Sequence, residues 1–128
     1  MKLLDTTFLI DLVRGNEKTR TFLSDTAELV TTQINMFELI RGFFLEGAKP
    51  AKILELAGMF EAIRVLPMDD IAIIKSAEIS ADLTSRGAII GDADCLIAGI
   101  ALSKGVTTIV TKNSKDFKRV KGITIEEY

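Results

Sequence analysis

The sequence predicts an α/β fold in which a parallel β-sheet is covered by helices on both faces. Short apolar segments alternate with longer segments whose apolar residues recur at helical spacing, and this order implies parallel strands joined by helices. Of the 128 residues, 48% are hydrophobic and 27% are charged, so the chain can bury a core of its own. No linker rich in Pro, Gly or Ser divides it. We therefore expect residues 1–128 to form a single globular domain.

The first quarter of the chain predicts two strands separated by helical turns. Residues 2–4 are an apolar run that ends at Asp5, which favours a buried strand followed directly by a helix. Residues 8–13 continue as a short helix, and residues 19–23 add one or two helical turns. Residues 28–32 are brief and contain β-branched residues, which predicts the second strand.

The middle of the chain predicts two helices and a third strand. The apolar residues of segment 34–46 recur at helical spacing up to Gly47, a residue type that commonly ends helices. A proline at its first position favours a second helix over residues 50–61. Residues 63–66 are short and apolar, as in a strand.

The last part of the chain predicts two longer helices and two strands. Residues 69–85 and 92–104 are amphipathic segments, each followed by a glycine. Residues 108–111 predict the fourth strand, and residues 123–125 predict the last one. Between these strands lies a basic segment, residues 112–121, which we expect to be a loop.

The composition excludes several kinds of site. Cys95 is the only cysteine and there is no histidine, which excludes a disulfide framework and most zinc sites, so any bound metal must be held by oxygen. An acid stands where a signal peptide needs its apolar centre, and no run reaches the ~18 apolar residues of a membrane span. We expect a cytoplasmic protein without membrane association. The net charge of −2 means that a nucleic-acid partner would have to bind local basic patches.

Asp5 stands at a position where α/β proteins bind ligands. It follows the first strand, and ligands of open α/β sheets bind at the carboxyl ends of the strands. The alternative is that Asp5 caps the following helix, together with Thr6 and Thr7.

Asp94 lies on the side of its helix that should pack against the sheet. Helical periodicity places it in one stripe with Ile97, Ala98 and Ala101. The alternative is a first-turn acid favoured by the helix dipole, with Asp92 as the better cap.

Glu38 also lies on the side of its helix that should face the sheet. Its stripe contains Ile34, Gly42 and Leu45 rather than polar residues. The alternative is an ion pair with Arg41, three residues further on. Burying an unpaired carboxylate costs several kcal/mol, so inward acids need a cationic partner, and a metal ion is a natural one.

Clustered carboxylates without His or Cys suit a hard divalent cation, because Mg²⁺ and Mn²⁺ prefer oxygen ligands and retain several waters. With a substrate phosphate in the remaining positions, such ions activate water and neutralise charge during phosphodiester hydrolysis. The basic segment after the fourth strand should flank the same sheet edge and attract RNA through Lys112, Lys115 and Lys118. The alternative is that these lysines belong to a solvated surface loop.

Four segments together carry a resemblance to a known family. They are residues 4–7 (LDTT), 38–42 (ELIRG), 94–101 (DCLIAGIA) and 111–117 (TKNSKDF). They occur in the order found in PIN-domain nucleases, and the chain resembles a VapC-type toxin of that family over nearly its whole length. The resemblance implies a three-layer α/β/α sandwich with a five-stranded parallel sheet and Mg²⁺- or Mn²⁺-dependent endoribonuclease activity. It also implies a homodimer and inhibition by a VapB-type antitoxin.

The resemblance also implies which residues form the site. Asp5, Glu38 and Asp94 match the acidic triad of the family, as catalytic residues and metal ligands. The fourth acidic position is occupied by Asn113, and a neutral amide binds a second cation more weakly than a carboxylate does.

Further residues are expected to support this triad. Asp116 is a candidate to compensate for the missing fourth acid, and Asp92 is a candidate accessory ligand. Thr6 and Thr111 resemble the residues whose hydroxyls orient water and acids in the family, and Asn113, two residues after Thr111, is expected to share this orienting role.

Other families fit the sequence less well. A haloacid-dehalogenase-type phosphatase would need a second acid where Thr7 stands, and a phosphoacceptor receiver domain would need an aspartate near residues 66–68. A dinucleotide-binding domain would need a glycine-rich turn after the first strand. The remaining alternative is a PIN-like module without activity that only binds a partner, and Asn113 favours it.

Segment 34–46 is also a candidate protein interface. Its apolar residues cover more of the helix than one sheet-facing stripe needs, so some should contact a dimer mate or an antitoxin. The alternative is that the next helix covers them.

Overall fold

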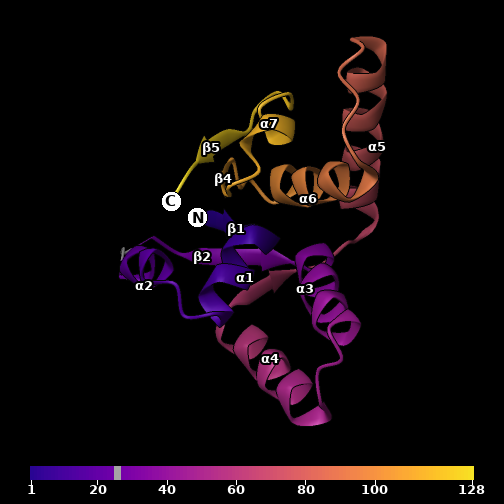
Figure 1. The fold of residues 1–128 in the computed structure, drawn as a ribbon. Coiled ribbons are helices and arrows are strands. Elements are labelled where there is room, and N and C mark those ends of the chain that lie inside the picture. The colour runs from indigo at the N-terminus through magenta and orange to yellow at the C-terminus, as the bar shows by residue number, and fades with distance from the viewer. Residues whose placement is uncertain (25–26) are drawn as a thin grey trace.

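The computed structural model describes residues 1–24 and 27–128, which form a parallel five-stranded sheet between two layers of helices (Figure 1). The strands are β1 (Lys2–Leu4), β2 (Leu29–Thr32), β3 (Arg64–Leu66), β4 (Thr108–Val110) and β5 (Thr124–Glu126). The helices are α1 (Thr6–Val13), α2 (Glu17–Leu23), α3 (Gln33–Leu45), α4 (Pro50–Ala62), α5 (Asp70–Ser85), α6 (Asp92–Ser103) and α7 (Ser114–Phe117). The predicted α/β/α class is confirmed.

The order of the strands reverses at β1, and we call the carboxyl edge of the sheet between β1 and β4 the crevice. The order is β3-β2-β1-β4-β5, so β1 pairs with β2 on one side and with β4 on the other. From β1 the chain builds outward to β3, then returns to place β4 on the opposite side of β1. Such a reversal of strand order is the usual ligand-binding position of open α/β sheets.

Alternating strand residues supply the two halves of the core. Leu3, Val30 and Ile109 are buried against α5, α6 and α7. Leu4 and Val110 point to the other face and pack with residues of α1, α3 and α4. This alternation explains why apolar residues on both sides of β1 and β4 are buried, because both faces of the sheet are covered.

The positions of α5 and α6 depend on a close backbone contact. A Cβ atom on Gly99 of α6 would lie 1.9 Å from Ser76 Oγ and 2.7 Å from Ser76 Cα of α5. Only glycine permits this approach. Ser76 Oγ donates a hydrogen bond to the Ala72 carbonyl oxygen of its own helix, at 2.7 Å. The contact holds α6, and with it the acid-bearing first turn, against the rest of the domain.

The structure shifts the ends of several expected elements by one or two residues and corrects the basic segment and the last strand. Part of the expected loop over residues 112–121 is the short helix α7, which a periodicity argument misses because it has a single turn. Its fully buried Phe117 anchors it in the core. The last strand was expected at residues 123–125 and instead comprises Thr124–Glu126, because the Ile123 amide donates to the Val120 carbonyl oxygen in the preceding turn.

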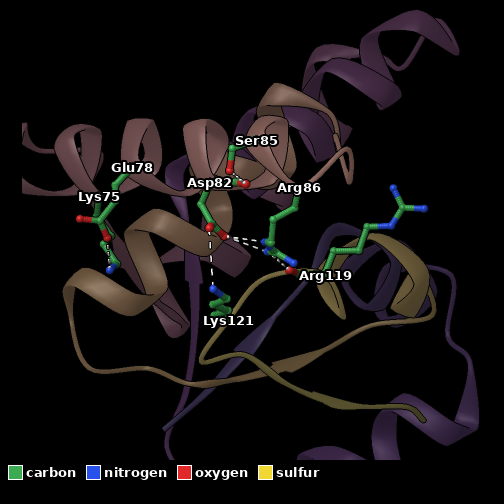
Figure 2. Close-up of polar contacts among 7 residues, drawn as sticks. All are labelled: Lys75, Glu78, Asp82, Ser85, Arg86, Arg119 and Lys121. Atoms are coloured by element: carbon green, nitrogen blue, oxygen red, sulfur yellow. Dashed lines mark hydrogen bonds and ion pairs between the residues drawn. The ribbon is translucent and has the colours of Figure 1, made fainter.

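The basic segment is partly used to hold α5 in place (Figure 2). Asp82 of α5 accepts hydrogen bonds from Arg86 Nε at 3.1 Å and Nη2 at 2.8 Å, and it lies 3.8 Å from Lys121 Nζ. Arg86 Nη2 also donates to the Arg119 carbonyl oxygen at 2.8 Å. We call Asp82, Arg86 and Lys121 the Asp82 cluster.

Over the described ranges 1–24 and 27–128, no helix has the length and apolar content to cross a membrane.

Candidate metal centre

Asp5 is buried at the crevice between β1 and β4. Its side chain is 4% exposed, and its amide donates to the Val110 carbonyl oxygen at 3.0 Å. Asp5 Oδ1 accepts from Asn35 Nδ2 at 3.0 Å, and Oδ2 accepts from Thr111 Oγ1 at 2.6 Å. Asp5 occupies the N-cap position of α1, yet its side chain makes no capping hydrogen bond. The helix-cap alternative therefore lacks its expected bond.

Thr111 connects Asp5 with the loop after β4. Since its hydroxyl proton goes to Asp5, Thr111 Oγ1 accepts from the Asn113 amide at 2.9 Å and from Thr7 Oγ1 at 3.2 Å. Thr7 Oγ1 in turn accepts from the Lys112 amide at 3.2 Å. The backbone at 111–113 is thereby tied to α1 and to Asp5.

Glu38 reaches the same crevice from α3. Its Oε1 accepts from Thr6 Oγ1 at 2.8 Å, and its side chain is half-buried. No Glu38–Arg41 ion pair is present in the part of the chain that the structure describes. The inward-facing stripe expected for α3 included Leu45. This residue does not face inward, because it is 69% exposed. The buried residues of α3 are instead Asn35 and Leu39, which places Glu38 beside the sheet-facing line.

Asp94 lies in the first turn of α6 and is half-buried, with Ile97, Ala98 and Ala101 buried on the same stripe as predicted. The predicted cap is wrong. Gly91 holds the N-cap position, because the chain enters α6 one residue before Asp92, which is exposed and already helical. The structure places Asp92 on the α5 side, in a pocket that it shares with residues 73, 76–77, 80 and 95–96.

Electrostatics connect four carboxylates, which we call the acid cluster: Asp5, Glu38, Asp94 and Asp116. Burial, followed by the charges of Asp5, Asp116 and Glu38, raises the pKa of Asp94 to about 6. Burial also raises the pKa of Asp5, although hydrogen bonds led by that from Thr111 oppose this. The pKa of Glu38 is raised by burial and by the charge of Asp5, while the Thr6 hydrogen bond lowers it. Each of these three carboxylates therefore holds its negative charge at a cost.

The donor set of the acid cluster fits a hydrated hard cation better than a closed metal cage. None of its four carboxylates pairs with a Lys or Arg side chain among residues 1–24 and 27–128. Nor do three His, Cys, Asp or Glu side chains of these ranges form a ready group that could hold a metal ion. Mg²⁺ needs no such cage, because it commonly takes one or two carboxylates and fills its remaining positions with water and phosphate oxygens.

The predicted RNA-binding residues divide into two kinds. Lys112 forms an ion pair with Asp11 at 2.7 Å, and its Nζ lies 5.2 Å from the centre of the Tyr128 ring. Lys115 and Lys118, on α7 and at its end, are exposed. Lys112 is thus directed toward α1 and the end of the chain, while the other two lysines face solvent.

Asn35 is a residue of the site that the sequence argument missed. It is fully buried, and it contacts both Asp5 and Thr6. A signal was present, because Asn35 precedes Leu39 by four residues and so lies on the inward line of α3. Asn113 and Asp116, which were predicted, do lie at the crevice, next to Thr111 and Asp94 respectively.

Comparison with known proteins identifies relatives over most of the chain. The model of the PIN domain family matches residues 2–123. The chain is 33% identical over 107 residues to the tRNA(fMet)-specific endonuclease VapC of Salmonella typhimurium, covering 84% of this chain and 80% of that protein. It is 32% identical over 126 residues to Ribonuclease VapC1 of Methanocaldococcus jannaschii, covering 98% and 85%. A structure of DNA-bound VapBC from Salmonella typhimurium superposes with a TM-score of 0.83 at 32% identity, covering 98% and 96%.

Proposed function

The chain belongs to the PIN domain family, and from this premise we propose that it is a metal-dependent endoribonuclease, the toxin of a toxin–antitoxin pair. The observation that carries the proposal is the acid cluster. Three of its four carboxylates, which lie at the end of β1, on α3 and on α6, gather at the crevice of the sheet, with raised pKa values and without a Lys or Arg partner in the described ranges. Such an arrangement is costly unless a cation is bound.

Each side chain has a separate task in the proposed reaction, in which water is added across a P–O bond of RNA. Asp5 and Asp94 would hold Mg²⁺ or Mn²⁺, and Glu38 would contribute the third carboxylate. The bound ion would activate water and neutralise charge at the phosphate. Thr111 and Thr6 keep Asp5 and Glu38 in place through their hydroxyl protons.

Residues around the acids complete the proposed site. Asp116 lies close enough to influence the pKa of Asp94 and is the acid that could compensate for Asn113. Lys115 and Lys118 are the exposed cations available for RNA phosphates, whereas Lys112 holds the loop by its ion pair with Asp11.

The apolar surface of α3 is the proposed site for protein partners. Phe37, Phe44 and Leu45 are 64%, 59% and 69% exposed, so α4 does not cover them, and they line a groove of about 620 Å³. An exposed apolar groove of this kind marks a protein interface. We assign it to a VapB-type antitoxin or to a second copy of the chain in a homodimer. Light scattering of the toxin alone and with its candidate antitoxin tests this, and a monomer under both conditions would overturn it.

Cleavage of RNA in defined metal conditions tests the proposed function. The purified protein is incubated with initiator tRNA, chosen because the Salmonella relative is named for it, and with total RNA. We expect cleavage in Mg²⁺ or Mn²⁺, none in EDTA, and none with Asp5→Asn. A protein that binds its antitoxin but cleaves neither RNA would instead be an inactive PIN-like module, the alternative that Asn113 favours.

A further inference from the structure

Asn35 is the centre of a buried hydrogen-bond network that joins two of the acids. Its side chain is 0% exposed. Asn35 Nδ2 donates to Asp5 Oδ1 and to Thr6 Oγ1, both at 3.0 Å, and Asn35 Oδ1 accepts from Thr32 Oγ1 at 2.7 Å. Thr6 Oγ1 then donates to Glu38 Oε1 at 2.8 Å.

The direction of every bond in this network follows from its neighbours. Thr32 Oγ1 accepts from the Asn35 backbone amide at 3.2 Å, so its own proton is available for Asn35 Oδ1. That leaves the amide nitrogen, with its two hydrogens, facing the Asp5 carboxylate and the Thr6 oxygen. Because Thr6 Oγ1 accepts from Asn35, its proton is directed to Glu38. Rotating the amide by half a turn would place its oxygen against the Asp5 carboxylate, which can only accept.

One planar amide therefore sets the positions of two carboxylates. It contacts Asp5 directly and Glu38 through a single hydroxyl. The two hydrogens on Asn35 Nδ2 lie in one plane with a fixed angle between them. The positions of their acceptors, Asp5 Oδ1 and Thr6 Oγ1, are therefore fixed relative to each other as well. We propose that Asn35 is a positioning residue that holds Asp5 and Glu38 in register for a divalent cation, an inference that rests on the proposed function.

The fold itself does not account for this side chain. The α3 N-cap is made by Thr32 Oγ1 with the backbone amide of residue 35, a bond that any residue except proline at that position can form. An apolar residue of similar volume would fill the same buried space without the cost of burying an amide. What such a residue cannot do is donate to Asp5 and Thr6 together. The groups that orient metal ligands typically change metal affinity or activity 10–100-fold when they are removed, roughly the size of effect expected here.

The test uses the full-length protein with Mn²⁺ as the probe. Asn35→Leu removes the amide and keeps the number and branching of the side-chain heavy atoms, although Leu is larger. Thr32→Val removes the hydroxyl that orients the Asn35 side-chain amide, whereas Thr32→Ser keeps a hydroxyl at this position. Thr19→Val is the matched control, because Thr19 on α2 is also 0% exposed and its hydroxyl donates to the Asn16 carbonyl oxygen at 2.6 Å. Each variant is measured for Mn²⁺ affinity by titration calorimetry, for melting temperature, and for kcat and KM of RNA cleavage at saturating Mn²⁺.

We expect Asn35→Leu to weaken Mn²⁺ binding and to lower kcat by about 10–100-fold each, with an unchanged KM for RNA. Thr32→Val should change the same quantities in the same direction by a smaller factor, while Thr32→Ser and Thr19→Val should match the wild type in metal affinity and kcat. A purely structural role would lower the melting temperature alone, as in Thr19→Val.

Three outcomes would overturn the assignment. If Asn35→Leu binds Mn²⁺ and turns over like Thr19→Val, Asn35 does not position the acids. If Asn35→Leu does not fold, the Thr32 pair decides, and equal Mn²⁺ affinities of Thr32→Val and Thr32→Ser would reject the network. If the wild type neither binds Mn²⁺ nor cleaves RNA, the proposed function fails first and this inference fails with it.

Discussion

The acid cluster and the Asp82 cluster place the same functional group in opposite electrostatic environments. At the surface of α5, hydrogen bonds and the charge of Arg86 lower the pKa of Asp82 (Figure 2). In the crevice, Asp94 has three carboxylates as its charged neighbours, and its pKa rises to about 6. A surface carboxylate close to an arginine stabilises the local structure. A buried carboxylate among other carboxylates destabilises it unless a cation is bound.

Asp69 and Asp11 extend the comparison. The pKa of Asp69 is lowered by its hydrogen bond with Lys104, and that of Asp11 by its hydrogen bond with Lys112. Asp82, Asp69 and Asp11 therefore each have a Lys or Arg partner, whereas the four carboxylates of the acid cluster have none in the described ranges. If the proposed function holds, possession of a cationic partner distinguishes the structural from the functional carboxylates of this domain.

The largest expected effect is the loss of RNA cleavage in Asp94→Asn. The amide keeps the volume of the side chain but is a weaker cation ligand, so activity should fall by orders of magnitude while the domain stays folded. The melting temperature of the metal-free protein should stay equal or rise, because one like charge leaves the acid cluster. RNA cleavage and thermal melts measure both quantities, with Asp82→Asn as the matched control that keeps activity. If Asp94 were only a dipole-favoured first-turn acid, the variant would remain active and lose about 0.3–1 kcal/mol of stability.

The second prediction is stabilisation of the wild type by Mg²⁺ or Mn²⁺. A ligand that binds only the folded state adds about 2.7 kcal/mol of stability at 100 times its Kd. The melting temperature should therefore rise with Mn²⁺ concentration in the wild type and much less in Asp94→Asn. A protein whose melting temperature is unmoved by millimolar Mn²⁺ but raised by Zn²⁺ would contradict an oxygen-ligand site.

The fold was predictable because its elements have strong local signals. Each strand is short and contains apolar residues, and the long helices α3, α5 and α6 are each followed two residues later by a glycine. The one-turn helix α7 has no period to detect, since it is fixed by the burial of Phe117 rather than by its own pattern. Helix α1 begins at Thr6, two residues before the expected helix, because Asp5 occupies the N-cap position even though its side chain makes no capping hydrogen bond.

The candidate site was predictable to a lesser degree. Helical periodicity placed Asp94 on the buried side of α6, and the strand end placed Asp5 at the crevice. The contribution of Asn35 depends on hydrogen bonds to residues 29 and 30 positions away in the sequence, which no local pattern contains. The error at Leu45 has a similar cause, because its 69% exposure depends on how α3 packs against the rest of the domain, which helical periodicity alone does not determine.

The third prediction concerns the pH dependence of the metal-free protein. The pKa of Asp94 is about 6 in the folded state and near its ordinary value of 3.8 when unfolded, so the folded state binds this proton more tightly. The stability contributed by Asp94 is therefore fully present below about pH 4 and is lost as the pH rises through about 6. The carboxylates with lowered pKa values act in the opposite direction, because their contribution is lost on acidification. Subtracting the unfolding free energy of Asp94→Asn from that of the wild type at each pH isolates the contribution of the Asp94 carboxyl group to stability. A difference that stays constant between pH 4 and 7 would contradict the placement of Asp94 among like charges.

The smallest expected effect is that of Asp82→Asn on stability, and it completes the comparison. Asp82 loses its charge in this variant, so its bonds to Arg86 weaken and its attraction to Lys121 disappears. Both partners are at the surface, where water and salt screen the interaction, so the melting temperature should fall only slightly. The loss should shrink further in about 1 M salt, where the screening length is about 3 Å. Mn²⁺ stabilisation and RNA cleavage should be unchanged, since the hydrogen bonds and ion pairs of Asp82 in the described ranges join it to Arg86 and Lys121 and not to the acid cluster. If instead Asp82→Asn reduced cleavage as strongly as Asp94→Asn, possession of a cationic partner would not distinguish structural from functional acids, and the distinction drawn between the two clusters would have to be abandoned.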